Sequence, residues 1–146
     1  MNFEHSAKTK DYITKVKAFI RDNIEPVEAQ IYRELHQLNP GGDWQNWKLH
    51  PLVEQFKGMA KQQGLWNLFL PDEQLGKGLT TLEYAPLAEE MGRMLFTPEI
   101  FNCNAPDTGN MEVLYHFGNE QQKEQWLKPL LEGEIRSVFG LSLIHI

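Results

Sequence analysis

Apolar residues recur every three or four positions through residues 9–36, and this period is typical of one stripe of an amphipathic helix. Pro26 interrupts the stripe, where it removes a backbone donor and clashes with the preceding turn. We therefore expect either a kink near Asn23 or two helices in tandem. The stripe consists of Ile13, Val16, Phe19, Ile20, Ile24, Val27, Ile31 and Leu35.

The segment 38–50 that follows is rich in turn-forming residues, with Pro40-Gly41-Gly42 near its start. It carries two tryptophans, Trp44 and Trp47. Indole side chains bury a large area, so we expect both to pin this loop onto its own domain. The alternative is an exposed aromatic contact site.

A second helix is expected from Pro51, a residue suited to the first helical position, to Gly64. The apolar run 65–70 (LWNLFL) is too short for an ordinary globular helix. It favours a buried extended connector, with a lone strand as the weaker alternative.

Thr80 and Glu83 have the spacing of a capping box and predict the start of another helix. Glu89 and Glu90 in this helix resemble an acid–base pair. However, adjacent helix positions point about 100° apart, so the two carboxylates would not converge on one substrate atom. We expect them, with Arg93, on a solvated face. The inward face is expected to hold Leu82, Ala85, Leu87, Ala88, Met91 and Leu95.

The last third of the chain alternates helix caps with short helical patterns. Asp107 or Thr108 can cap one helix, and Asn119 with Gln122 can cap the next, which Pro129 should bend. No period-two pattern is sustained before Ile135. The sequence therefore predicts an all-α fold, an orthogonal or up-down bundle of about six helices, with the start of a β-strand near 135–140.

Composition and charge exclude several classes of protein. The 146 residues carry a net charge of −6 with acidic and basic residues interspersed, which argues against nucleic-acid binding because that requires a basic stripe. No apolar run approaches the roughly 20 residues of a membrane span. The N-terminal residues lack the apolar core of a signal peptide, so we expect no export by that route.

Most chemical motifs are absent. The histidines lack zinc-ligand spacing, and Cys103, the single cysteine, is expected to be a buried structural thiol. Gly76 and Gly78 lack the strand and third glycine of a dinucleotide-binding loop. We expect no metal site and no catalytic residue in this chain, so these patterns alone predict only a helical domain.

The amino-acid sequences of longer segments say more about the family of the protein. Residues 64–93 (GLWNLFLPDEQLGKGLTTLEYAPLAEEMGR) resemble two helical blocks of the acyl-CoA dehydrogenase family. Residues 102–112 (NCNAPDTGNME) and 118–133 (GNEQQKEQWLKPLLEG) are similar to the subgroup known as members 10 and 11 of that family. The resemblance extends over roughly residues 9–140.

The resemblance implies an N-terminal helical domain, followed in the family by a central β-domain and a C-terminal four-helix bundle. It implies FAD-dependent α,β-dehydrogenation of acyl-CoA to 2-enoyl-CoA, in which a carboxylate base removes the α-proton. Electrons would pass to an electron-transfer flavoprotein, and the full-length protein would be a homo-oligomer. The helical domain would wall the acyl pocket and help to bury the flavin.

The same resemblance suggests which residues touch the ligands. The segment that lies against the flavin in the family corresponds here to Phe139, Gly140, Leu141 and Ser142. A helix expected at 100–106 corresponds to the wall of the acyl pocket. Its candidate substrate-lining residues are Asn102, Cys103 and Pro106.

The expected organisation is a helical domain at 1–134 and the start of the β-domain at 135–140. Residues 141–146 (LSLIHI) resemble the translation of a transposase end sequence used in sequencing libraries, and we expect them to be a non-native truncation tail. The fragment would be inactive alone, and its parent would be cytoplasmic in a bacterium, or mitochondrial or peroxisomal in a eukaryote. The alternative function is a free-standing helical interaction module.

Overall fold

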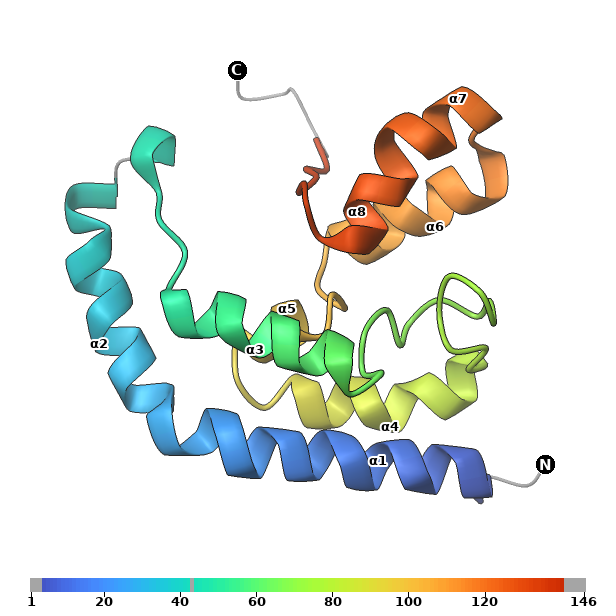
Figure 1. Ribbon diagram of the computed structural model, residues 1–146, viewed down its shortest axis with the longest axis horizontal. Helices are drawn as coiled ribbons and strands as arrows, with labels where there is room; N and C mark the ends of the chain where they lie inside the picture. The colour runs from blue at the N-terminus through green and yellow to red at the C-terminus, as the bar shows by residue number, and fades with distance from the viewer. Residues whose placement is uncertain (1–3, 43, 141–146) are drawn as a thin grey trace.

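All regular structure in the described residues, 4–42 and 44–140 of this computed structural model, is helical (Figure 1). Six runs of the chain contain α-helix, so the prediction of an all-α fold with about six helices is confirmed. Among the described helices, none is long and apolar enough to cross a membrane. The α-helices are α1 (Ala7–Phe19), α2 (Glu28–Leu38), α3 (Pro51–Gln62), α4 (Thr81–Met91), α5 (Thr97–Ile100), α6 (Asp107–Phe117), α7 (Glu120–Gln122) and α8 (Lys128–Glu132).

The first helical run bends where proline predicts it. A π-helical turn, Ile20–Ile24, and a 3-10 turn, Glu25–Val27, separate α1 from α2. Asn23 Nδ2 donates to the Phe19 carbonyl at 3.0 Å within this bend. As a result α2 leaves the axis of α1 (Figure 1). The expected kink near Asn23 is confirmed.

The loop between α2 and α3 differs from expectation. It contains two 3-10 turns, Pro40–Gly42 and Trp44–Asn46, and Trp47 is 57% exposed. The prediction that Trp47 pins the loop onto its own domain is therefore wrong. A polar contact holds the described ends of the loop together, since Asn39 Oδ1 accepts the Lys48 N–H at 2.7 Å; the Trp44 side chain lies outside the described part.

α4 lies alongside α1 (Figure 1), and its capping box at Thr80 and Glu83 is confirmed. Ser6 Oγ at the start of α1 donates to Glu83 Oε1 at 2.8 Å, so the two helices are joined at their N-terminal ends. Glu90 pairs with Lys17 at 3.0 Å on the α1 side, and it is not on a fully solvated face.

Three of the expected inward positions of α4 are wrong, and the helix geometry explains each. Leu82 and Ala85 are exposed because they lie on the side of α4 opposite Leu87, which is fully buried. Leu95 is exposed because α4 ends at Met91, so the helical period does not extend to it.

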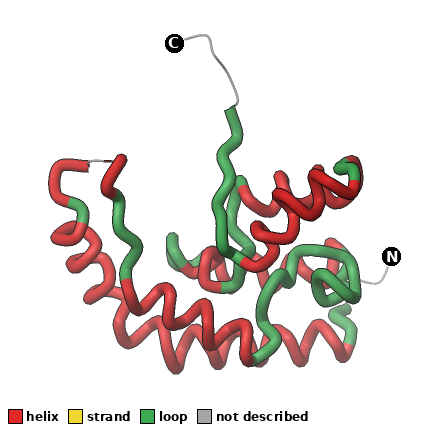
Figure 2. Tube along the Cα trace, turned by 45° about the horizontal axis from the view of Figure 1, so that its top comes forward, coloured by secondary structure: helices red, strands yellow, loops and turns green. Residues whose placement is uncertain are grey.

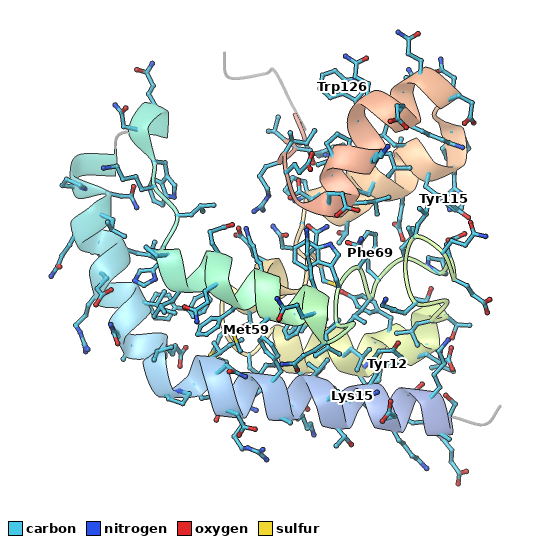
Figure 3. The ribbon with its side chains drawn as sticks, in the orientation of Figure 1. Tyr12, Lys15, Met59, Phe69, Tyr115 and Trp126 are labelled. Carbon is cyan, nitrogen blue, oxygen red and sulfur yellow. The ribbon has the colours of Figure 1, made fainter. Side chains whose placement is uncertain are left out.

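The run 65–70 is a buried connector and not a strand, as expected, but its backbone is a series of bends and turns, with a φ of 56° at Asn67, so the expectation of an extended backbone is wrong. Leu65, Leu68 and Leu70 are fully buried in the core shared by the helices. Figure 3 shows Phe69 between the α3–α4 layer and the α6–α8 arm. The three leucines belong to the same buried apolar cluster as residues of α1, α3, α4, α6 and α8.

The last third begins differently from the prediction. α5 ends at Ile100, and residues 101–106 form an irregular segment with a cis Ala105–Pro106 peptide bond, so the helix expected at 100–106 is absent. Neither Asp107 nor Thr108 caps α6. Pro106 occupies the cap position, and Asp107 is the first helical residue. The Asn119 capping box is confirmed.

After α8, residues 134–140 leave the helices as an extended segment (Figure 2). No strand is assigned to the described part of this segment, because a strand requires a hydrogen-bonded partner. The expected start of a β-domain thus stays a prediction. Leu141 and Ser142, and the rest of the tail expected at 141–146, lie outside the described residues.

Candidate functional site

The extended segment 134–140, called here the exit segment, directly follows a glycine that no other residue can easily replace. Gly133 has a left-handed φ of 70° and ends α8. A Cβ atom at this position would lie 2.8 Å from Trp66 Cζ2. Trp66 is fixed in turn, since its Nε1 donates to the Leu131 carbonyl at 2.7 Å. Gly133 therefore lets the chain reverse closely over Trp66.

One buried carboxylate holds the exit segment against the first turn of α6. Asp107 Oδ1 accepts the Ser137 N–H at 2.7 Å and the Ser137 hydroxyl at 2.5 Å. Asp107 Oδ2 accepts Arg136 Nε at 2.5 Å. The Asp107 side chain is 2% exposed, so its charge is neutralised almost entirely by these neighbours and by the helix N-terminus.

A chain of alternating charges extends from this carboxylate to α3. Arg136 Nη1 donates to Glu99 Oε1 at 2.6 Å, and Lys57 Nζ lies 2.7 Å from the same oxygen. Desolvation lowers the pKa of the Arg136 guanidinium, but the carboxylates of Glu99 and Asp107 outweigh it, and the pKa is raised overall. Arg136 therefore stays charged and joins the exit segment to α5 and α6 together.

A groove of about 320 Å³ lies between α6, the helical run that ends in α8, and the exit segment. Trp126 lies on this arm in Figure 3 and is half exposed. Apolar side chains form most of the groove, and its polar groups lie where the exit segment begins. It is lined by Asn110, Val113, Leu114, Trp126, Leu130, Ile135, Arg136 and Ser137.

Phe139 and Gly140, two of the four predicted flavin contacts, lie beyond this groove. The Phe139 side chain is 64% exposed, and no atom lies within 4 Å of a Cβ built on Gly140. Within the described part of the chain, the backbone groups of both residues make no hydrogen bond. Both residues therefore lie on an open part of the exit segment.

The structure places Asn102 and Cys103 inside the protein, not on the groove. Asn102 is 5% exposed, and its Nδ2 donates to the Leu130 carbonyl at 3.0 Å. Cys103 Sγ donates to the Phe101 carbonyl at 3.2 Å, and burial raises the pKa of its thiol to about 11. The expectation that Cys103 is a buried structural thiol is confirmed.

Pro106, the third predicted substrate-lining residue, is half-buried and directly precedes Asp107. It is thus the one member of that set adjacent to the residues that hold the exit segment. Sequence reasoning missed the roles of Arg136 and Asp107, which lie 29 positions apart. No local pattern signals such a pair.

No group of three or more histidine, cysteine, aspartate or glutamate residues in the described ranges could hold a metal ion. The side chains of Arg136 and Ser137 are already engaged with Asp107, Asn110 and Glu99. Among the described residues, the site therefore offers an apolar groove and an exposed aromatic segment.

Comparison with known proteins identifies the family of this chain. Residues 6–134 match the family model described as acyl-CoA dehydrogenase, N-terminal domain. Acyl-CoA dehydrogenase family member 11 of Gallus gallus is 47% identical over 140 residues, which are 96% of this chain and 17% of that protein. "Probable acyl-CoA dehydrogenase FadE2" of Mycobacterium tuberculosis is 47% identical over 143 residues, 97% of this chain and 33% of that protein.

A solved structure named "Structure of a putative acyl-CoA dehydrogenase from Mycobacterium abscessus" superposes with a TM-score of 0.81 at 50% identity. The match covers 91% of this chain and 33% of that one. The chain thus spans a third or less of the length of these relatives. With most of its length matched by the family model and its helices arranged as in this relative, the chain belongs to the acyl-CoA dehydrogenase family, as its N-terminal helical domain.

Proposed function

We propose that this chain is the N-terminal helical part of an FAD-dependent acyl-CoA dehydrogenase that converts acyl-CoA to 2-enoyl-CoA. The observation that carries the proposal is the exit segment, which begins along an apolar groove and presents the exposed Phe139 ring beyond it. In this role the chain supplies surfaces, and the chemistry is supplied elsewhere. FAD, when bound, would accept the hydride from the acyl β-carbon.

Phe139 and Gly140 would lie against the flavin, with Leu141 and Ser142 continuing the contact. Gly140 has open space around its Cα, so a ring could approach the backbone closely there. The free N–H and C=O groups nearby could bond to polar edge atoms of the ring. These residues would cover only one side of the cofactor, so the remaining contacts must come from other parts of a longer protein.

Pro106 and the apolar groove would form part of the acyl pocket wall. Asn102 and Cys103 are proposed to belong to the same wall but to act from behind it, because their side chains are buried. An apolar wall favours a fatty acyl chain by removing its methylene groups from water, at about 0.8 kcal/mol for each. No carboxylate of this chain is proposed as the catalytic base.

The longer protein is proposed to bind acyl-CoA, to pass electrons to an electron-transfer flavoprotein, and to form a homo-oligomer. For its compartment we propose the bacterial cytoplasm, or the mitochondrion or peroxisome in a eukaryote. The family resemblance supports these assignments.

A chimera tests the proposal. Residues 6–140 of this chain would replace the matching part of the Mycobacterium abscessus relative, which is 50% identical. We expect the purified chimera to retain flavin through desalting and to lose flavin absorbance when acyl-CoA is added. A folded chimera that holds no flavin, beside an unmodified relative that does, would refute the proposal. As a control, the isolated chain mixed with FAD should retain none.

The alternative, a free-standing helical interaction module, is favoured by apolar side chains that the helices leave uncovered, including Phe117 at 81% exposed and Leu95 at 89%. In a domain of a larger enzyme these would be covered by neighbouring domains, and the isolated chain should be poorly soluble. A monodisperse, flavin-free chain that binds one defined partner would support the module instead.

A further inference from the structure

We propose that Arg136 and Asp107 are positioning residues that fix where and in which direction the flavin-facing segment leaves the helical domain. This role rests on the function proposed above. The pair touches neither substrate nor cofactor in the proposal. It acts through Val138, Phe139 and Gly140, which follow Ser137 in the chain.

The first argument is geometric. Both oxygens of the Asp107 carboxylate are used, one by the Ser137 N–H and hydroxyl and the other by Arg136 Nε. Asn110 Nδ2, one turn further along α6, donates to Ser137 Oγ at 2.8 Å and to the Val138 carbonyl at 3.4 Å. Backbone and side chains of consecutive residues are thus held at several points, which fixes the orientation of the chain as well as its position.

The second argument is energetic. Asp107 is almost fully buried, so releasing Arg136 would leave a buried carboxylate without a cation, a costly state. Arg136 is also held by Glu99, which Lys57 of α3 holds in turn. The arrangement in which Arg136 contacts both carboxylates is therefore strongly favoured. It fixes the position of the exit segment relative to α3, α5 and α6.

The third argument concerns what this anchor aligns. Asp107 directly follows Pro106, the proposed end of the acyl pocket wall, and Gly140 lies within about 10 Å of chain from Ser137. The same turn of α6 therefore sets both the wall and the origin of the flavin-facing segment. A loosened anchor would change the distance between acyl chain and flavin, to which reaction rates are sensitive.

Amide hydrogen exchange in the 146-residue chain tests the anchor without any cofactor. In Arg136→Met we expect exchange of the Ser137 N–H to accelerate about tenfold or more, while amides in the middle of α1 keep their wild-type rates. Arg136→Lys should restore part of the protection, since it keeps the charge but not the two-pronged contact. Lys128→Met, which removes an exposed ion pair with Glu124, should leave Ser137 unchanged.

Unchanged Ser137 protection in Arg136→Met, with the rest of the chain folded, would overturn the inference. If Arg136→Met does not fold, Asp107→Asn takes its place, because it removes the carboxylate charge that pairs with Arg136 and keeps the shape of the side chain. Its expected effect is lower order of the Val138 and Phe139 amides in nitrogen relaxation. Wild-type order at both amides would equally overturn the inference.

The chimera separates this inference from the function on which it rests. If the wild-type chimera binds flavin, Arg136→Met should alter the flavin spectrum and lower kcat more than it raises KM, with recovery in Arg136→Lys. A flavin-bound chimera with unaltered spectrum and kcat in Arg136→Met would refute the positioning role and leave the proposed function standing. A wild-type chimera without flavin would refute the proposed function. The hydrogen-exchange experiment would still test whether Arg136 and Asp107 position the exit segment.

Discussion

The side-chain amides of Asn67 and Asn102 are hydrogen-bonded inside the protein, with Asn102 Nδ2 donating to Asn67 Oδ1 at 2.7 Å. Both residues have left-handed backbone angles, with φ values of 56° and 53°. Asparagine tolerates this region better than most residues. The pair also caps the end of α8, since Asn67 Nδ2 donates to the Leu131 carbonyl at 3.0 Å and Asn102 to that of Leu130.

Replacing Asn102 by alanine should therefore destabilise the fold by about 2–4 kcal/mol, because it combines left-handed strain with unpaired buried acceptors. Asn102→Gly should relieve the backbone strain but not restore the hydrogen bonds, so its loss of stability should be smaller than that of Asn102→Ala. Urea denaturation followed by tryptophan fluorescence would measure both. Asn104→Ala is the matched control, since among the described residues the Asn104 Oδ1 is buried without a partner. An equal loss in Asn104→Ala would contradict this interpretation.

Two glycines should respond to alanine with opposite signs. At Gly133 the left-handed φ and the 2.8 Å approach to Trp66 make a methyl group unfavourable, and we expect a loss of at least about 1–2 kcal/mol. Gly58 lies inside α3, and a Cβ there meets nothing within 4 Å. Gly58→Ala should stabilise by about 0.5–1 kcal/mol through helix propensity. Thermal unfolding of both variants measures this, and a shift in the same direction would be inconsistent with the geometry.

Asp72 should make stability depend on pH. The Leu75 N–H above all, and then the Tyr115 hydroxyl, lower the pKa of its carboxyl group. A lowered folded-state pKa means that the stabilisation is present above the unfolded pKa of about 3.9 and is lost as pH falls through the folded value. The stability difference between wild type and Asp72→Asn should therefore be largest near neutral pH and shrink in acid. In Tyr115→Phe the free energy of unfolding should depend less on pH than in wild type. A stability difference between wild type and Asp72→Asn that does not change with pH would disprove this account.

The local features of the fold could be predicted from the sequence, because each depends on a few neighbouring residues. The bend at Pro26, the helix start at Pro51 and the capping boxes at Thr80 and Asn119 all follow from backbone donors within a few positions. Leu95 was placed wrongly because a three-to-four-residue period continues past the point at which the helix ends.

The candidate site was harder to predict, for a physical reason. The amide of Asn102 is engaged by Asn67, 35 positions away, and Arg136 by Asp107, 29 positions away. Such contacts depend on how helices pack, and no spacing rule encodes them. Phe139 and Gly140 were singled out by resemblance alone, and that they lie on an open segment is information that only the structure adds.

Cys103 should be unreactive in the folded protein. The thiol is buried, and burial raises its pKa to about 11, so at pH 8 almost none of it is the nucleophilic thiolate. We expect an aromatic disulfide reagent to label native chain only at the rate of local or global opening, and to label urea-unfolded chain at the rate of an ordinary cysteine. Because the folded-state pKa of the thiol is raised, burial of the protonated thiol contributes stability below the unfolded pKa of about 8.5. This contribution declines as pH rises above that value.

Leu70→Ala, which opens a cavity in the shared core, should accelerate labelling of Cys103 in the native chain, whereas the exposed Lys128→Met should not. Rapid labelling of the native wild-type chain would show that Cys103 is reachable from solvent, and would restore it as a residue on the open face of the acyl pocket wall.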